Sequence, residues 1–228
     1  MKKKILLVTL VVCVLAMTFA SATIAYFTDT KTATNTFTTG DIKITLSEAD
    51  PANGNALTEV DGTTLTGFQY QNVYPSQEIA KNPTITNVSA NDAAYVAAII
   101  TLDNGKTGND AITKILPDKD AVEKFLVGGA LHANGFTTKY VIGEDTITIY
   151  VLANAPLDKD AAIALFGSVK IPAKWDVAEM KIFSTLKITI KAYATQTAGF
   201  GNNAANAIQA AFGGGADSTN GDFAGYFN

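Results

Sequence analysis

The amino-acid sequence predicts an all-β fold, a jelly-roll-like sandwich of two sheets with a few short helices in the connections. Three observations lead to this prediction. Apolar and polar residues alternate with a period of two in several segments, which is the pattern of half-buried strands. Stretches with helical spacing are few and short. A turn at Gly143 and Glu144 joins two of the alternating segments as a hairpin.

Six segments are expected to form strands. The first places Ile42, Ile44 and Leu46 on one face and polar residues on the other. The third is apolar on both faces, so we expect it to be covered on both sides, and the sixth is the longest. Residues 49–66 are polar and rich in Asn, Gly and Thr, which is typical of a loop or a weak hairpin. The expected strands are residues 41–48, 83–89, 93–103, 137–142, 145–152 and 181–194.

Three short helices are expected between and after the strands. Residues 116–126 and 156–166 share an Asp-Lys-Asp-Ala start followed by apolar residues at helical spacing. Asp120 with Glu123 matches a capping box, and Asp160 can cap the second helix. Calcium binding by the paired aspartates is the alternative, but no glycine-punctuated loop with a bidentate glutamate accompanies them. The third helix covers residues 203–212 and ends at a run of glycines.

Residues 1–25 have the features of a signal peptide. Three lysines at positions 2–4 precede an apolar run over residues 5–16, and small residues follow. Ala20-Ser21-Ala22 and Thr23-Ile24-Ala25 both fit a small-x-small cleavage rule, and an uncleaved membrane anchor is the alternative. We therefore expect a secreted protein. Cleavage after Ala25 leaves 14 lysines against 21 acidic residues, a net charge of −7 in place of −4.

Composition and motifs argue against several functions. The chain is acidic and contains no arginine, so we expect no binding to nucleic acid. The one cysteine, Cys13, lies in the expected signal peptide, so the exported chain has neither thiols nor disulfides. The one histidine, His132, lies in a glycine-flanked loop and is expected at the surface. Without a catalytic motif, we predict a protein that is not an enzyme, with no catalytic, metal or cofactor-binding residues.

The stretch after the expected signal peptide has an unusual composition for a strand. Threonine occupies every even position from 28 to 38, while Phe27, Ala33 and Phe37 are the apolar residues of the other face. The alternation and the β-branched residues are typical of a strand, but the segment has few apolar side chains to bury in a hydrophobic core. The resulting organisation is a signal peptide at 1–25, a separate strand at 26–40, the sandwich domain at 41–212 and a flexible glycine-rich tail at 213–228.

Four stretches of the chain form a recognisable set: "ATIAYFTDTKTATNTFTTGDIKITL", "VYPSQEIAKNPTITNVSANDAAYVAAIITL", "YVLANAPLDKDAAIALFGSVKIP" and "LKITIKAYATQTAGF". Together they resemble the TasA/camelysin family of secreted proteins from Gram-positive bacteria. They cover roughly half of the chain in the family's order and spacing, and Ser76 stands where the family usually has glycine.

The resemblance implies a jelly-roll domain that polymerises into fibres of the extracellular biofilm matrix. It implies cleavage between Ala25 and Tyr26 by a SipW-type signal peptidase, and insertion of the freed N-terminal strand into the next copy of the same chain. Gly40 would then be the hinge into the domain. The donor-strand residues on this basis are Tyr26, Phe27, Thr28, Thr30, Thr32, Ala33, Thr34, Thr36 and Phe37.

Simple energetics agree with a strand that is ordered only when it is received. Residues 28–39 extend over about 40 Å. Backbone hydrogen bonds contribute about 0.5–1.5 kcal/mol each, while ordering costs about 1–2 kcal/mol per residue, so the hydrogen-bond ladder alone is close to neutral. β-Branched threonine lowers the ordering cost, and burial of Phe27 and Phe37 adds about 1.5–3 kcal/mol each.

Two further functions remain open at this point. Some relatives in the family are described as camelysin-type cell-surface metallopeptidases, although His132 is the only imidazole available here. The chain could instead be a monomeric adhesin, or an accessory protein that nucleates or anchors a different fibre. The expected partners are the chain itself, the signal peptidase and an accessory protein of this kind.

Overall fold

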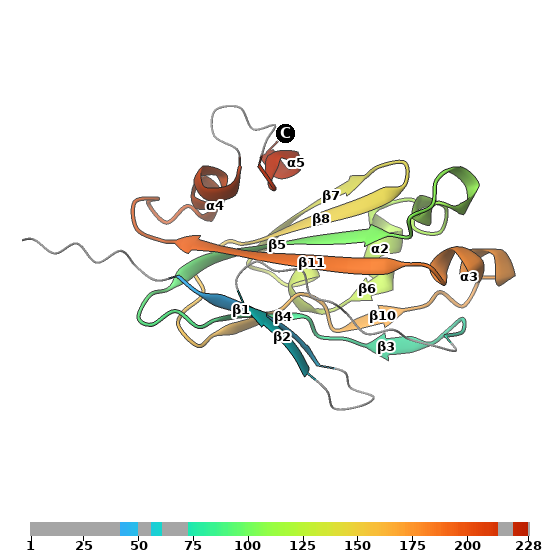
Figure 1. Cartoon of the computed structure of the whole chain (residues 1–228), viewed down its shortest axis with the longest axis horizontal. Helices are drawn as coiled ribbons and strands as arrows, with labels where there is room; N and C mark the ends of the chain where they lie inside the picture. Colours follow the sequence, from blue (N-terminus) through green and yellow to red (C-terminus); the bar gives the residue numbers. More distant parts are fainter. Residues whose placement is uncertain (1–41, 50–55, 61–72, 214–220, 228) are drawn as a thin grey trace, which may run out of the picture. The chain divides into compact units, whose positions relative to one another are not determined.

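The computed structural model describes residues 42–49, 56–60, 73–213 and 221–227. Within these ranges the protein is all-β, with three antiparallel sheets and a few short helices (Figure 1), which confirms the predicted fold class at this level. The central sheet has the strand order β11-β5-β8-β7. Its strands are β11 (Lys187–Gln196), β5 (Ala94–Asp103), β8 (Thr146–Ala153) and β7 (Phe136–Ile142).

The central sheet contains the predicted hairpin and the strand that is apolar on both faces. In the hairpin, Ile142 pairs with Ile147, and the N–H of Gly143 donates to the carbonyl oxygen of Thr146 at 2.9 Å. Every side chain of β5 from Ala94 to Ile100 is buried. Hydrophobic residues on both faces of one strand require cover on both sides, and the remaining elements supply it.

Two smaller sheets cover one face of the central sheet. The first has the order β2-β1-β4-β9, from β2 (Ala56–Val60), β1 (Ile44–Ala49), β4 (Thr84–Asn87) and β9 (Ala162–Ala164). Residues 49–66, expected as a loop or a weak hairpin, contain β2, which pairs with β1, a strand that lies almost entirely before that segment. The second has the order β3-β10-β6, from β3 (Glu78–Ala80), β10 (Ser168–Lys170) and β6 (Leu126–Val127).

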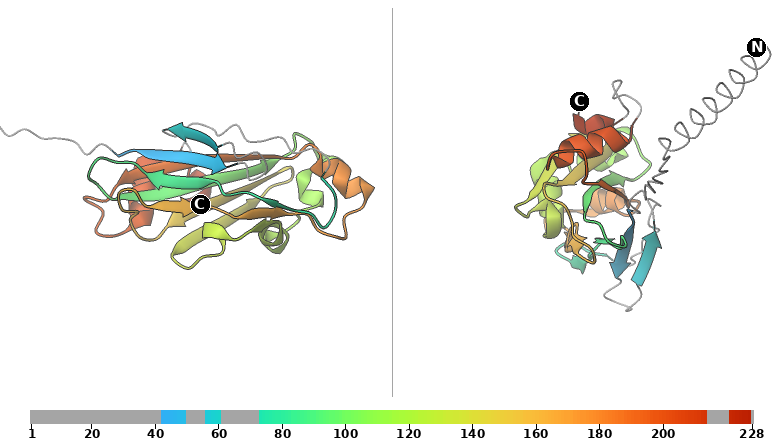
Figure 2. Two further views of the ribbon diagram at one scale, coloured as in Figure 1. Left: turned by 90° about the horizontal axis from the view of Figure 1, so that it is seen from below. Right: turned by 90° about the vertical axis from the view of Figure 1, so that its left-hand side faces the viewer.

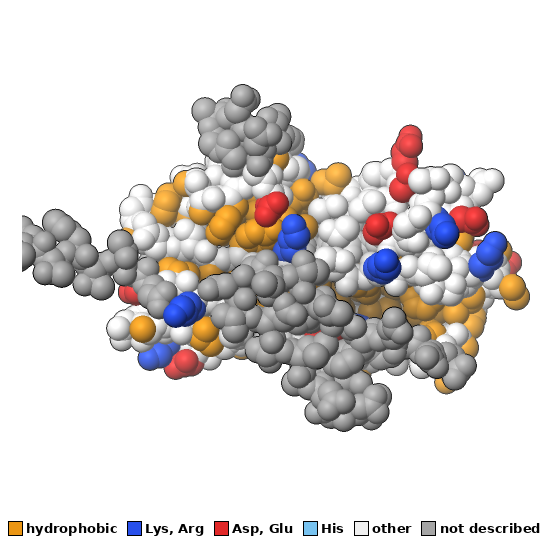
Figure 3. All heavy atoms as spheres, in the orientation of Figure 1, with side chains coloured by type: hydrophobic (Ala, Val, Ile, Leu, Met, Phe, Trp, Pro, Cys, Tyr) orange, Lys and Arg blue, Asp and Glu red, His pale blue; other side chains and the backbone are white. Residues whose placement is uncertain are grey.

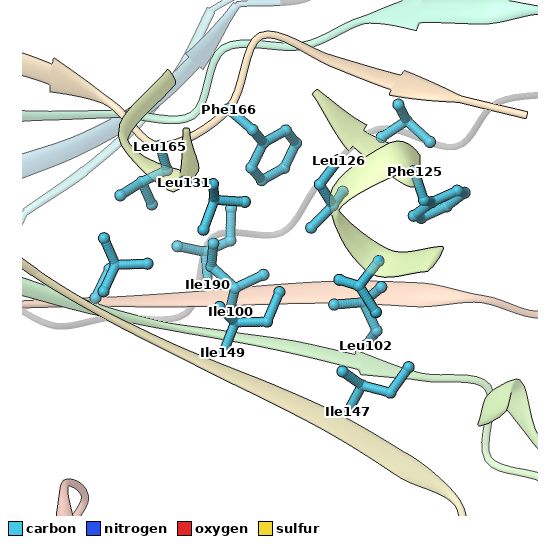
Figure 4. Close-up of a cluster of buried hydrophobic side chains, with 14 of the residues drawn as sticks. Ile100, Leu102, Phe125, Leu126, Leu131, Ile147, Ile149, Leu165, Phe166 and Ile190 are labelled. Atoms are coloured by element: carbon cyan, nitrogen blue, oxygen red, sulfur yellow. The ribbon is translucent and has the colours of Figure 1, made fainter. Parts of the chain in front are cut away.

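The main hydrophobic core lies between the central sheet and these two sheets. Ile100, Ile149 and Ile190 project into it from three neighbouring strands, opposite Leu126 and Phe166 (Figure 4). Even-numbered residues of β5 and β11 face this core, as the period of two requires. An ion pair joins β1 to the residue after β3, where Lys81 Nζ lies 2.5 Å from Glu48 Oε1.

Helices at the C-terminal end cover the other face of the central sheet, called the outer face below. They are α4 (Ala204–Phe212), with Asn203 as its N-cap, and α5 (Ala224–Phe227). Figure 2 shows both helices on one side of the sheet and β1 and β2 on the other. Phe223 is fully buried there, with its ring 5.1 Å from that of Tyr193. The loosely held tail expected over 213–228 therefore does not describe residues 221–227, which are anchored by aromatic packing.

Two predicted elements are wrong, one because of tertiary pairing and one because a local capping signal was missed. Residues 156–166 form no helix, because Asp160 adopts a left-handed φ of 61° and β9 pairs with β4. Asp160 is therefore not a helix cap. The start of the strand expected over 181–194 is instead helix α3 (Val177–Phe183), because Asp176 and Glu179 form a complete capping box.

The helix expected over 116–126 is present as α2 (Lys119–Phe125), but its cap differs from the prediction. The side chain of Asp118, not that of Asp120, accepts a hydrogen bond from the N–H of Ala121 at 2.8 Å. Asp118 has the extended backbone of an N-cap, whereas Asp120 already lies inside the helix. The remaining short turns are the 3₁₀ helices η1 (Gly108–Asp110), η2 (Ile112–Lys114) and η3 (Gly129–Leu131).

Candidate functional site

The residues that the sequence singled out for function lie outside the described part of the chain. This applies to the cleavage site at Ala25 and Tyr26, to the donor strand over residues 26–39 and to the Gly40 hinge. The described chain begins at Ile42, two residues beyond Gly40. The described residues can still be searched for a sheet edge that is able to accept a further strand, and the central sheet offers one.

β11 is the longest strand at an edge of the central sheet. It has ten residues and pairs along its full length with β5, from Lys187 opposite Asp103 to Gln196 opposite Ala94. No other strand within the described ranges pairs with its second edge. In an antiparallel ladder about half of the residues of such a strand direct N–H and C=O groups away from their partner. This row of backbone groups, called the β11 edge below, can accept a further strand.

The two faces of β11 differ in chemistry. Ile190 and Ala192 are buried in the main core, with exposed fractions of 3% and 2%. Lys187 and Lys191 are exposed on the outer face. Lysine on an edge strand disfavours indiscriminate pairing with other chains. β11 is thus packed into the main core on one face, and on its other face two exposed lysines disfavour pairing with unrelated chains.

The C-terminal segment anchors the outer face of β11 at Tyr193. The Tyr193 hydroxyl donates to Asp222 Oδ2 at 2.7 Å, and its ring packs against Phe212 and Phe223 with 5.1 Å between centroids in both cases. Burial raises the pKa of Tyr193 above its usual value, and the hydrogen bond to Asp222 and the charge of that carboxylate raise it further. At neutral pH the tyrosine is therefore protonated and donates this bond.

A hollow lined by five apolar residues and by two polar ones, Thr195 and Gln196, lies at the C-terminal end of β11. Its volume is about 320 Å³. Four separate parts of the chain form it: the start of the described domain, the end of β11, the loop after it and the last turns of α4. The lining residues are Ile42, Ala194, Thr195, Gln196, Phe200, Ala210 and Ala211. Ile42 is the first described residue of the chain and follows Asp41 in the sequence.

The residues considered for metal binding are dispersed. Among the described residues, no three His, Cys, Asp or Glu side chains are grouped to hold a metal ion. His132 is exposed at the end of η3, where its Nε2 lies 2.7 Å from the carbonyl oxygen of Leu126. Asp118 is engaged as a helix cap, and Asp158 and Asp160 are exposed in a turn.

Comparisons with known proteins found no match, whether with family profiles, with curated proteins or with solved structures. None of the helices in the described ranges is long and apolar enough to cross a membrane. The sequence reasoning missed the hollow, because its residues come together from positions 42, 194–200 and 210–211. The signal available in the sequence was the pair of small residues Ala210 and Ala211 near the end of the helix expected over 203–212.

Proposed function

We propose that the chain is a secreted structural subunit of the TasA/camelysin kind, which forms extracellular matrix fibres by donating its N-terminal strand to the next copy. In this proposal the sandwich is a jelly roll, residues 1–25 are removed by a SipW-type signal peptidase, and the protein performs no catalysis. The observation that supports it best is the β11 edge, because a ten-residue edge strand offers a receiving site of the right length.

The lengths of donor and receiver agree. β11 extends over roughly 33 Å, and residues 28–39 over roughly 40 Å. A strand added to the β11 edge would pair along all of β11 and leave two residues over. Strand addition gains affinity from the main-chain ladder and specificity from alternate side chains. Phe27 and Phe37 are ten residues apart, so both lie on one face of the donor and reach the two ends of β11.

The test compares two single substitutions in the full-length chain. Phe37→Asp removes an apolar contact of the donor strand and places a charge at the receiving sheet, whereas Thr34→Asp adds the same charge on the opposite face of the donor. We expect filaments from the native chain, fewer and shorter filaments from Thr34→Asp, and the strongest loss from Phe37→Asp. Electron microscopy and sedimentation of the secreted proteins give the readout.

Deletion of residues 26–39 is the stronger perturbation. We expect a folded monomer, with the circular dichroism of a β-sheet protein, that makes no filaments. Filaments of unchanged abundance would refute strand donation. If the native chain stays monomeric for hours during size-exclusion chromatography, the adhesin or accessory-protein function replaces the proposed one. Metal-dependent cleavage of casein that is lost in His132→Ala would instead support a peptidase.

A further inference from the structure

The two ends of β11 present different surfaces. Lys187 pairs with Asp103 of β5. The next residue, Asn104, donates a hydrogen bond to the carbonyl oxygen of Ile182 in α3, so this end of β11 lies near α3. Gln196, at the other end, lines the hollow. In Figure 1, α3 and α4 accordingly lie at opposite ends of the central sheet. The structure thus has an α3 end and a hollow end.

The α3 end carries the most exposed large apolar side chains of the described domain. Val177, the first residue of α3, is 87% exposed, and Tyr74 is 62% exposed. Both belong to this end, because the N–H of Ser76 donates to the carbonyl oxygen of Ile171, a few residues before α3. Figure 3 shows hydrophobic side chains reaching the surface where α3 and β3 lie. These two exposed apolar side chains are therefore available at this end for contact with another molecule.

The direction of a donated strand decides which ends meet. All pairings between strands of the described residues are antiparallel, and antiparallel pairing is also the more stable kind. A donor antiparallel to β11 begins beside Gln196 and finishes with Thr39 beside Lys187, at the α3 end. Only Gly40 and Asp41 separate Thr39 from Ile42, which limits the distance between those Cα atoms to about 11 Å.

We propose that the hollow end of each copy docks on the α3 end of the copy that receives its strand, with Val177 and Tyr74 covering the hollow. The proposal rests on strand donation, and its occupant is a second copy of this chain. The short connection at Gly40 and Asp41 carries Ile42, and with it the hollow, to the exposed apolar residues of the receiver. The contact is head-to-tail, so it repeats without closing and extends a filament with one polarity.

Thiol cross-linking tests this contact in the full-length chain. The native sequence has a single cysteine, Cys13, so all variants carry Cys13→Ser. Val177→Cys is mixed with Ala211→Cys under oxidising conditions. The control mixes Ala211→Cys with Val141→Cys, whose parent valine is 40% exposed on β7, the opposite edge of the central sheet. Val177, Ala211 and Val141 are all exposed, so the fold should be kept.

We expect a covalent dimer between Val177→Cys and Ala211→Cys in assembled protein, identified by peptide mapping of a non-reducing gel band. Thiols held together reach an effective concentration near millimolar, so this dimer should form roughly 1,000-fold faster than the control dimer in micromolar protein. Filaments with no excess of this dimer over the control overturn the end contact and leave strand donation standing. Cross-linking of Ala211→Cys with itself indicates a parallel donor and also overturns it. Absence of all filaments overturns both proposals.

Discussion

Phe223 and Phe125 are equally buried phenylalanines whose replacement by alanine should have different consequences. Both side chains are 0% exposed. Phe125 lies in the main core, with its ring 6.0 Å from those of Trp175 and Phe183. Phe223 lies on the outer face, 5.6 Å from the ring of Tyr150. Phe125 therefore packs in the core between the sheets, whereas Phe223 holds residues 221–227 against the outer face of the central sheet.

The magnitudes follow from this difference. Phe125→Ala should lower the free energy of unfolding by about 3–5 kcal/mol, the usual cost of such a change in a core. Phe223→Ala can cost no more than the free energy that holds residues 221–227 closed, since these residues then detach and leave the sheet folded. For a terminal segment we put this limit at about 2 kcal/mol. At about 2–4 °C per kcal/mol, Phe125→Ala lowers Tm by roughly 6–20 °C and Phe223→Ala by less than roughly 8 °C.

Urea denaturation and hydrogen exchange measured by mass spectrometry distinguish the two variants. Phe223→Ala should speed exchange within residues 221–227 and α4 while exchange in β5 stays slow. Phe125→Ala should lower the denaturation midpoint and speed exchange throughout the main core. Equal midpoint shifts for the two variants, or unchanged exchange in residues 221–227 of Phe223→Ala, would refute the reasoning.

Two further predictions concern backbone conformation and pH. Gly129→Ala should lower the free energy of unfolding in urea by more than about 3 kcal/mol, because φ is 63° and a Cβ would lie 2.6 Å from backbone atoms of Leu165. Gly105→Ala, where φ is 65° but the space around the Cβ is open, should lower it by only about 1–2 kcal/mol. Equal losses for the two variants would contradict the steric explanation. Burial raises the pKa of Tyr193 in the folded protein, so its contribution to folding stability is complete below the pKa of about 10 in the unfolded chain and is lost as pH rises through the folded-state pKa. Hydrogen exchange in residues 221–227 should therefore accelerate at alkaline pH, and less so in Tyr193→Phe. Identical pH profiles for the native chain and Tyr193→Phe would count against this prediction.

The strands whose hydrophobic pattern matches their burial could be predicted from the sequence. β5 and the hairpin of β7 and β8 carry enough β-branched residues in the right period for local pattern to decide. β9 could not be found in this way, because it depends on pairing with β4, almost eighty residues earlier. The helical pattern of residues 156–166 was outweighed by that pairing and by the left-handed turn at Asp160.

α3 was missed although its signal was present. Asp176 and Glu179 have the spacing of a capping box, but the alternation of the following residues was extended backward into the helix. The candidate site was beyond local reasoning for another reason. Whether β11 is central or at an edge depends on the order of strands in the sheet, and the residues of the hollow meet only after the domain has folded.

The pairing of β5 with β11 also sets an order of events during synthesis. β5 is complete at Asp103, yet its partner β11 ends at Gln196, so most of the domain must be made before β5 is enclosed. Until β11 has been made, β5, which is apolar on both faces, can pair along one edge only, with β8. Non-local pairing of this kind slows folding and prolongs exposure of apolar surface. A chain that emerges N-terminus first therefore exposes one edge of this apolar strand until β11 has been made.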